Sequence, residues 1–245
     1  MSSASYSRVI VQLTYLVIGI SCITVVALTA YKGEIAQRDI ATAILALLGT
    51  FLGATLAFRL NEDKEATKLK AARRAALNRA MFVLGRQHNA IRQLKKEFDR
   101  FESHIEKAFK LPAIKPPSYT DLVHNFGDLE FMLESSDPNL LFLLTVEQER
   151  FHQALESLNI RNTFYVDEIQ HAMAEKSLNN KPLSIDQLAS SLGERLFNGA
   201  VNGANVAFEH IAASNETIPQ LHAKLFKFAK EMFPEHKFVR FEQVG

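Results

Sequence analysis

The stretch "ALLGTFLGATLAFRLNEDKEATKLKAARRAAL", Ala46 to Leu77, decides the fold. Its first third is apolar and uncharged, and the rest is rich in charged residues and alanine. After Gly53 no proline or glycine interrupts the chain until Gly85, so nothing in this part stops a helix. The stretch therefore predicts one helix that leaves an apolar environment and continues into water.

Two charge-free runs predict a transmembrane hairpin within residues 1–60. Val9 to Ala30 has 22 residues and Ile40 to Phe58 has 19. A bilayer core of about 30 Å needs about 20 apolar residues, so both runs are long enough to span it. A cleaved signal peptide is the alternative for the first run. The run exceeds the usual apolar region of such a peptide, and no A-x-A-like site follows it.

The net charge of +1 over 245 residues conceals a strong asymmetry, although it excludes a strongly basic nucleic-acid-binding protein. Residues before Arg59 sum to +1, Arg59 to Lys110 to +7, and Leu111 to Gly245 to −7. A basic arm, residues 61–110, thus joins the membrane segment to an acidic domain. Cys22 is the only cysteine, which excludes a disulfide framework and a cysteine metal site.

The positive-inside rule predicts the orientation of the hairpin. The flanks outside the two runs carry eight basic residues, Arg8 and seven from Arg59 to Arg79, whereas the connecting loop carries only Lys32 and Arg38. Both termini are therefore expected in the cytoplasm, with the protein in a bacterial inner membrane.

One face of the second span consists of small residues at helical spacing: Ala46, Gly49, Gly53 and Ala57. Small residues let helix backbones approach closely in lipid. The face is expected to pack either on the first span or on another copy of the chain. Neither span contains an ionisable residue, which argues against a proton relay or a voltage sensor. Two helices cannot enclose a pore, so a channel would require a homo-oligomer.

The arm combines an apolar stripe with exposed basic residues. Leu77, Leu84, Ile91, Phe98 and Ile105 recur every seven residues, but the partner positions His88, Lys95 and Glu102 are polar. The stripe therefore fits packing on the protein's own later helices at least as well as self-association. The basic residues are expected to contact anionic lipid, with nucleic acid as the less favoured alternative: Lys64, Lys68, Lys70, Arg73, Arg74 and Arg79.

The remainder is expected to be an all-α cytosolic domain, residues 119–245, after a proline-rich linker, residues 111–118. The expected helices are Tyr119 to Glu134, one that begins with Asp137 as N-cap and reaches Lys176, one from a Ser184–Gln187 capping box to Ala213, and Asn215 to Phe233. The "HKFVRFEQV" segment from His236 favours a short strand or an extended tail. The fold class is thus all-α: a transmembrane hairpin, a long helical arm and a cytosolic helical domain.

No motif predicts an enzyme, a cofactor or a metal site. Glu149-x-x-His152 and Glu168-x-x-His171 match the pattern of carboxylate-bridged metal sites, which requires two facing helices. Both fall in one expected helix, about 28 Å apart, so they cannot share a metal ion. Asn198, Asn202 and Asn205 line one helix face beside Gly199, Gly203 and Ala207. That face predicts either close helix packing or a small polar pocket or subunit contact.

In layout the chain resembles the two-span membrane effectors of bacterial antiphage systems, including retron-associated ones. The resemblance rests on the spans around "VIGISCITVVAL" and "AILALLGTFLGATLAF" and on the helical domain that follows them. It implies membrane disruption and growth arrest, restrained by a protein partner. The alternative function is a membrane-anchored scaffold or accessory protein whose acidic domain docks a cytosolic partner.

Overall fold

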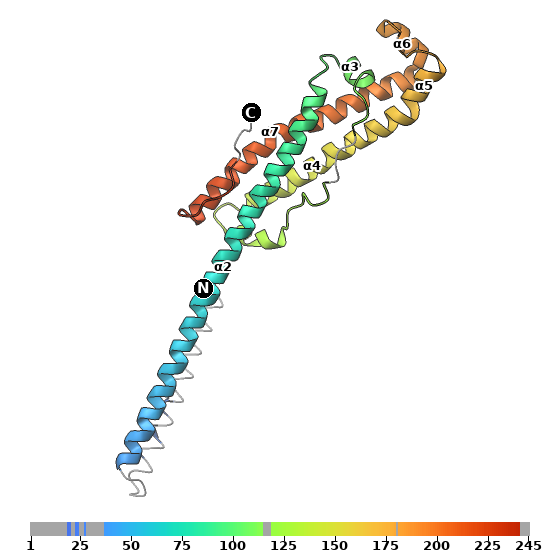
Figure 1. Ribbon diagram of the computed structural model, residues 1–245. Coiled ribbons are helices and arrows are strands. Elements are labelled where there is room, and N and C mark those ends of the chain that lie inside the picture. Colours follow the sequence, from blue (N-terminus) through green and yellow to red (C-terminus); the bar gives the residue numbers. More distant parts are fainter. Residues whose placement is uncertain are drawn as a thin grey trace. The chain divides into compact units, whose positions relative to one another are not determined.

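Every regular element in the described part of the chain is a helix (Figure 1), which confirms the all-α class. The computed structural model describes residues 37–114, 119–179 and 181–240, together with five positions between 19 and 27. The elements are α2 (Gln37–Phe98), α3 (His104–Phe109), the 3₁₀ helix η1 (Gly127–Glu134), α4 (Asn139–Phe164), the π-helix η2 (Tyr165–Ile169), α5 (Gln170–Glu175), α6 (Ile185–Leu192) and α7 (Glu194–Met232).

The chain divides into two compact units, residues 1–69 and 70–245. In the first, α2 carries an 18-residue window with a hydropathy of 1.9, none of it buried. Among the described helices α2 alone is long and apolar enough to cross a membrane. The hydroxyls of Thr50 and Thr55 donate to carbonyls one turn earlier, at 2.9 and 2.8 Å, so their polar groups are satisfied within the helix. Most of the first predicted span, Val9 to Ala30, and its loop lie outside the described residues, so the hairpin stays a prediction.

α2 is continuous through the predicted stretch from Asn61 to Leu84, which confirms the unbroken helix expected there. The helical pattern expected to reach Lys110 nevertheless breaks after Phe98. Ser103 caps α3 by accepting a hydrogen bond from the Glu106 backbone N–H at 3.1 Å. This local cap starts α3 as a separate helix, so α2 ends at Phe98 and the chain turns before α3 begins.

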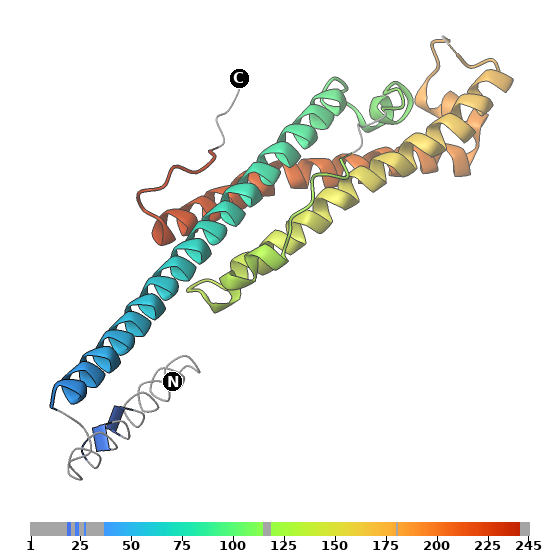
Figure 2. The same cartoon turned by 60° about the horizontal axis from the view of Figure 1, so that its bottom comes forward.

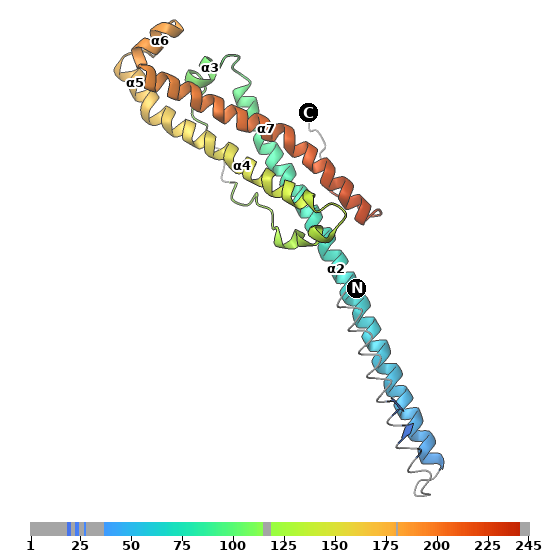
Figure 3. The same ribbon diagram turned by 180° about the vertical axis from the view of Figure 1, so that it is seen from behind.

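The second unit is built around a three-helix bundle of the latter part of α2 with α4 and α7 (Figures 1 and 3). α2 and α4 run in the same direction, and α7 runs opposite to both. Four members of the seven-residue stripe, Leu77, Leu84, Ile91 and Phe98, have no exposed surface and join one core cluster with residues of α4 and α7. The stripe therefore packs on the protein's own later helices, which was one of the two arrangements expected from the sequence; the other was self-association.

The predicted helix from Tyr119 to Glu134 is wrong in its first half, because only η1 forms. The backbone of the preceding loop is held by side chains instead. Gln87 Nε2 donates to the Leu122 carbonyl at 2.9 Å, and Gln148 Oε1 accepts from the His124 backbone N–H at 3.2 Å. These long-range bonds replace the local ones that a helix would need. Asp137 is also not the N-cap of α4, since Pro138 takes that position without a side-chain cap.

After Lys176 the break between helices was predicted at Ser214, but it lies at Gly193. The capping box of Ser184 and Gln187 is present, but α6 ends at Leu192 because Gly193 adopts a φ of +85°. α7 then runs unbroken past Ser214, with Pro219 inside it. Ile218, Leu221 and Leu225, on either side of the proline, are buried in the core, and their packing offsets the hydrogen bond that proline removes.

The segment after α7 is extended (Figure 2), and its contacts place it on the bundle. Phe238 is buried, and the Val239 backbone N–H donates to Asn78 Oδ1 of α2 at 3.0 Å. An extended tail is therefore confirmed as far as Arg240, and no strand forms in residues 233–240.

Candidate functional site

The small-residue face of α2 is exposed along its whole length. Ala46, Gly49, Gly53 and Ala57 are all open to the surroundings. A Cβ atom added at Gly49 or Gly53 would meet no described atom within 4 Å. No described part of the chain covers this face, so the close helix packing predicted for it stays a prediction.

The six basic residues predicted to contact lipid or nucleic acid divide into two groups. Lys64, Lys70 and Arg74 are exposed, and Lys68 is exposed with a 2.9 Å ion pair to Glu65. The other two also contact the bundle: Arg73 is half-buried and lies over the Phe131 ring at 5.2 Å, and Arg79, whose side chain is 64% exposed, pairs with Asp128 at 3.1 Å. Five of the six are therefore exposed to an anionic surface, and two of these five, Lys68 and Arg79, also pair with a carboxylate.

The predicted asparagine face of α7 does not enclose a polar pocket within the described structure. Asn198 and Asn202 are exposed, and Asn205 Oδ1 lies 2.5 Å from His104 Nδ1 of α3. The adjacent glycine face instead packs on α4, because a Cβ on Gly199 would lie 2.8 Å from Phe164 Cζ. Close helix packing, one of the two alternatives for this face, is thus confirmed at Gly199.

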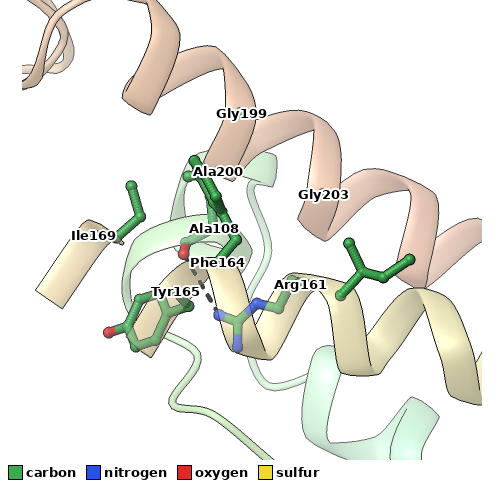
Figure 4. A pocket seen from close by; sticks show the side chains of 9 residues that line it. Ala108, Arg161, Phe164, Tyr165, Ile169, Gly199, Ala200 and Gly203 are labelled. Carbon is green, nitrogen blue, oxygen red and sulfur yellow. Dashed lines mark hydrogen bonds between the residues drawn. The ribbon is translucent and has the colours of Figure 1, made fainter. Parts of the chain in front are cut away.

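An apolar cavity of about 190 Å³ opens where the glycine face meets the end of α4 (Figure 4). Its walls come from α3, α4, η2 and α7: Ala108, Ile160, Arg161, Phe164, Tyr165, Ile169, Gly199, Ala200 and Gly203. Ile160, at its edge, remains 60% exposed. The cavity therefore connects with solvent and is large enough for a small molecule.

Arg161 is the one charged residue in the cavity wall, and it is 3% exposed. Its guanidinium is surrounded by oxygens of uncharged groups. Nη1 donates to the Pro112 carbonyl at 3.0 Å and to Asn162 Oδ1 at 3.1 Å, while Nη2 donates to the carbonyls of Lys107 and Ala108, at 3.3 and 3.4 Å, and of Leu111.

The guanidinium of Arg161 also lies over the Tyr165 ring, 4.6 Å from its centroid (Figure 4). Burial lowers its pKa to about 10, so it stays charged at neutral pH. Its hydrogen bonds tie α4 to the end of α3 and the start of the proline-rich linker. Among the described residues, no carboxylate contributes to the pKa of Arg161, whose electrostatic neighbour is Tyr165.

A π-turn, η2, lies directly beside the cavity. The backbone N–H of Gln170 reaches back to the Tyr165 carbonyl, one residue further than in an α-helix. Such turns are rare and often mark functional sites. This one places Tyr165 and Ile169 in the cavity wall, so the irregular helix helps to shape the cavity.

Neither a protein-family model, nor a curated protein, nor a solved structure matches this chain. The functional argument therefore rests on the chain's own geometry.

The residues of the two Glu-x-x-His motifs make other contacts. Glu168 pairs with Arg195 at 2.8 Å, and His171 Nδ1 lies 3.2 Å from the Val166 carbonyl. His152 Nε2 lies 3.0 Å from the Gln148 amide. No group of three or more metal-ligating side chains occurs among the described residues.

Sequence reasoning missed the buried polar groups at the centre of the bundle. Gln87 of α2 donates to Gln148 Oε1 of α4 at 3.1 Å, and both amides are buried. His124 is 5% exposed, and burial lowers its pKa to about 4. Neither of its ring nitrogens has a hydrogen-bond partner among the described residues. The glycine spacing had indicated close helix packing, and the pocket was expected at the asparagines, none of which lines the cavity.

Proposed function

We propose that the protein is a membrane effector or signal transducer of the bacterial inner membrane, of the antiphage type. Its helical domain responds to a trigger or a protein partner, and α2 passes the response to the membrane segment. The active form is a homo-oligomer, because one or two helices cannot enclose a pore. Both termini lie in the cytoplasm, and a reporter fused after Gly245 that works only in the periplasm would overturn this orientation.

The observation that supports this proposal is that two parts of the same helix, α2, have different chemistry and different surroundings. The helix has 62 residues without a break. Its first part is apolar and unburied, whereas the turns from Ala76 to Phe98 supply buried residues to the core of the bundle. One continuous helix therefore belongs to both the candidate membrane span and the folded domain. A loop or a glycine linker at that junction would instead favour a simple anchor.

A proline at Ala72 tests the coupling. Ala72 is exposed, so Ala72→Pro removes a helical hydrogen bond and kinks α2, at a cost of about 3 kcal/mol, without disturbing core side chains. In cells that overexpress the protein, we expect the wild type to depolarise the membrane and arrest growth. The kinked variant should lose both effects at equal membrane levels.

Ala72→Gln is the matched control, because glutamine at this exposed position keeps the helix. It should depolarise the membrane like the wild type. If the wild type depolarises and Ala72→Pro does so equally well, α2 is only a tether. If no overexpressed form affects the membrane, with or without other proteins of the host, the anchored scaffold is the better account.

A further inference from the structure

We propose that the cavity between α4 and α7 binds a small organic anion with an apolar body, such as an aromatic or short-chain monocarboxylate. The proposal concerns the helical domain and does not depend on the membrane function proposed above. Its support comes from the size of the cavity, from the glycines in its wall and from the charge of Arg161.

The size and the lining define the apolar part of the ligand. A protein cavity of about 150 Å³ holds benzene. The cavity here, about 190 Å³, therefore suits a molecule of about nine non-hydrogen atoms. Phe164 and Tyr165 offer aromatic surface, and Ile160 and Ile169 offer aliphatic surface. Because Ile160 is 60% exposed, a ligand can enter from solvent without unfolding α4 or α7.

Gly203 lines the cavity at a position where helix packing does not demand glycine. At Gly199 a side chain would collide with Phe164, so glycine is needed there for the close approach of α4 and α7. At Gly203 the nearest atoms to an added Cβ belong to Arg161 and lie 3.9 Å away, which is ordinary contact. Glycine within a helix costs about 1 kcal/mol relative to alanine. A side chain larger than a methyl group at Gly203 would therefore take up space between α7 and the Arg161 stem, where both residues line the cavity.

Arg161 selects the charge of the ligand. The guanidinium is almost fully buried, and every oxygen that it binds belongs to a carbonyl or an amide. These groups satisfy the N–H bonds of Nη1 and Nη2 but bring no negative charge. A buried charge without a counter-charge is costly. A carboxylate in the cavity would supply the missing charge to a residue that already forms its wall.

Three probes of similar size test the proposal: benzoate, benzamide and benzylamine. Each is titrated calorimetrically into the full chain in detergent. We expect saturable one-to-one binding of benzoate, with a Kd of about 1 mM or tighter, and at least about tenfold weaker binding of the other two. Gly203→Val, which fills the cavity, should abolish binding. Asn202→Val introduces the same residue at an exposed position and should bind as the wild type does.

Two measurements keep the test decisive if a variant is unstable. Gly203→Ala should weaken benzoate binding severalfold while it keeps or raises the thermal midpoint, which separates a filled cavity from a misfolded domain. The neutral probe tests the charge without any substitution at Arg161. The proposal is overturned if the wild type binds no probe below about 10 mM, if benzamide or benzylamine binds as tightly as benzoate, or if folded Gly203→Val retains full affinity.

Discussion

Gly199 and Gly203 lie one turn apart in α7, yet they face different neighbours. A Cβ on Gly199 would collide with Phe164, whereas a Cβ on Gly203 would make only ordinary contacts with Arg161. The same substitution therefore has different consequences at the two positions, although helix propensity favours alanine by about 1 kcal/mol at both.

Gly203→Ala should raise the free energy of unfolding by up to about 1 kcal/mol, because the new methyl group meets only ordinary contacts. Gly199→Ala should be less stable than Gly203→Ala by about 1 kcal/mol or more, since the Phe164 ring must move. Chemical denaturation measures both. Adding Phe164→Leu should bring the two alanine variants closer together, and equal stabilities without it would contradict the contact.

The buried histidines predict acid sensitivity of the helical domain. Burial lowers the pKa of His124 and of His222 to about 4. Between about pH 4 and pH 6.5 the unfolded chain therefore binds protons that the folded chain does not. Stability should be full above about pH 6.5 and should fall as the pH decreases toward 4, by roughly 3 kcal/mol for each histidine at most.

His124→Leu should remove part of this pH dependence. The unfolding free energy at pH 7.5 should change little, because neither ring nitrogen of His124 has a hydrogen bond to lose within the described structure. His171→Gln, at an exposed position, is the control and should leave the profile unchanged. Denaturation midpoints between pH 4 and pH 8 measure the effect. A flat profile for the wild type would refute the buried-histidine account.

Individual site residues were only partly predictable from sequence. The glycine spacing indicated a close helix contact, and the structure places Gly199 there. Arg161 carried no such signal, because its partners are carbonyls of residues about 50 positions earlier. A pattern that repeats every three or four residues indicates which face of a helix is buried. It does not indicate contacts with segments that are distant in the sequence and fold back onto that helix.

At the scale of elements, the long apolar and seven-residue patterns predicted α2 well. Its unbroken course from Asn61 to Leu84 and the buried stripe follow from residues that agree with each other over many turns. The shorter elements were less predictable. Pro219 suggested a helix start and lies inside α7, while Gly193, with its positive φ, makes the real break. Here tertiary packing outweighs local propensity.

The small-residue face of α2 predicts helix association in lipid. Gly49→Leu or Gly53→Leu places a bulky side chain on a face that no described residue covers, so the isolated helix tolerates it. A partner helix can then no longer approach closely, so the proposed oligomer should lose at least one subunit and show a lower mass in detergent. Size-exclusion chromatography with light scattering measures the mass. Leu52→Ala, on another exposed part of the helix, is the control, and unchanged masses in both glycine variants would exclude this face from the interface.

At the scale of the whole molecule, α2 is a single helix whose successive parts differ in chemistry. An apolar, unburied segment precedes exposed basic turns, and buried turns of the bundle core follow. This order follows directly from the sequence "ALLGTFLGATLAFRLNEDKEATKLKAARRAAL". In the proposed arrangement the first part of this helix faces lipid and a partner helix, the next turns face water, and the last turns have one buried face. Each part should differ measurably in its accessibility.

A spin-label scan from Ala46 to Leu77 in lipid vesicles tests this central claim most directly. Cys22 is first replaced by serine, since it is the only cysteine, and labels are then introduced one position at a time. We predict that oxygen relaxes labels from Ala46 to Phe58 and that a water-soluble nickel complex relaxes labels after Asn61. Where the bundle begins and one helix face becomes buried, accessibility to nickel should rise and fall with a period of 3.6 residues. Nickel accessibility throughout the first part, or a loss of helical order between Phe58 and Lys70, would contradict the account.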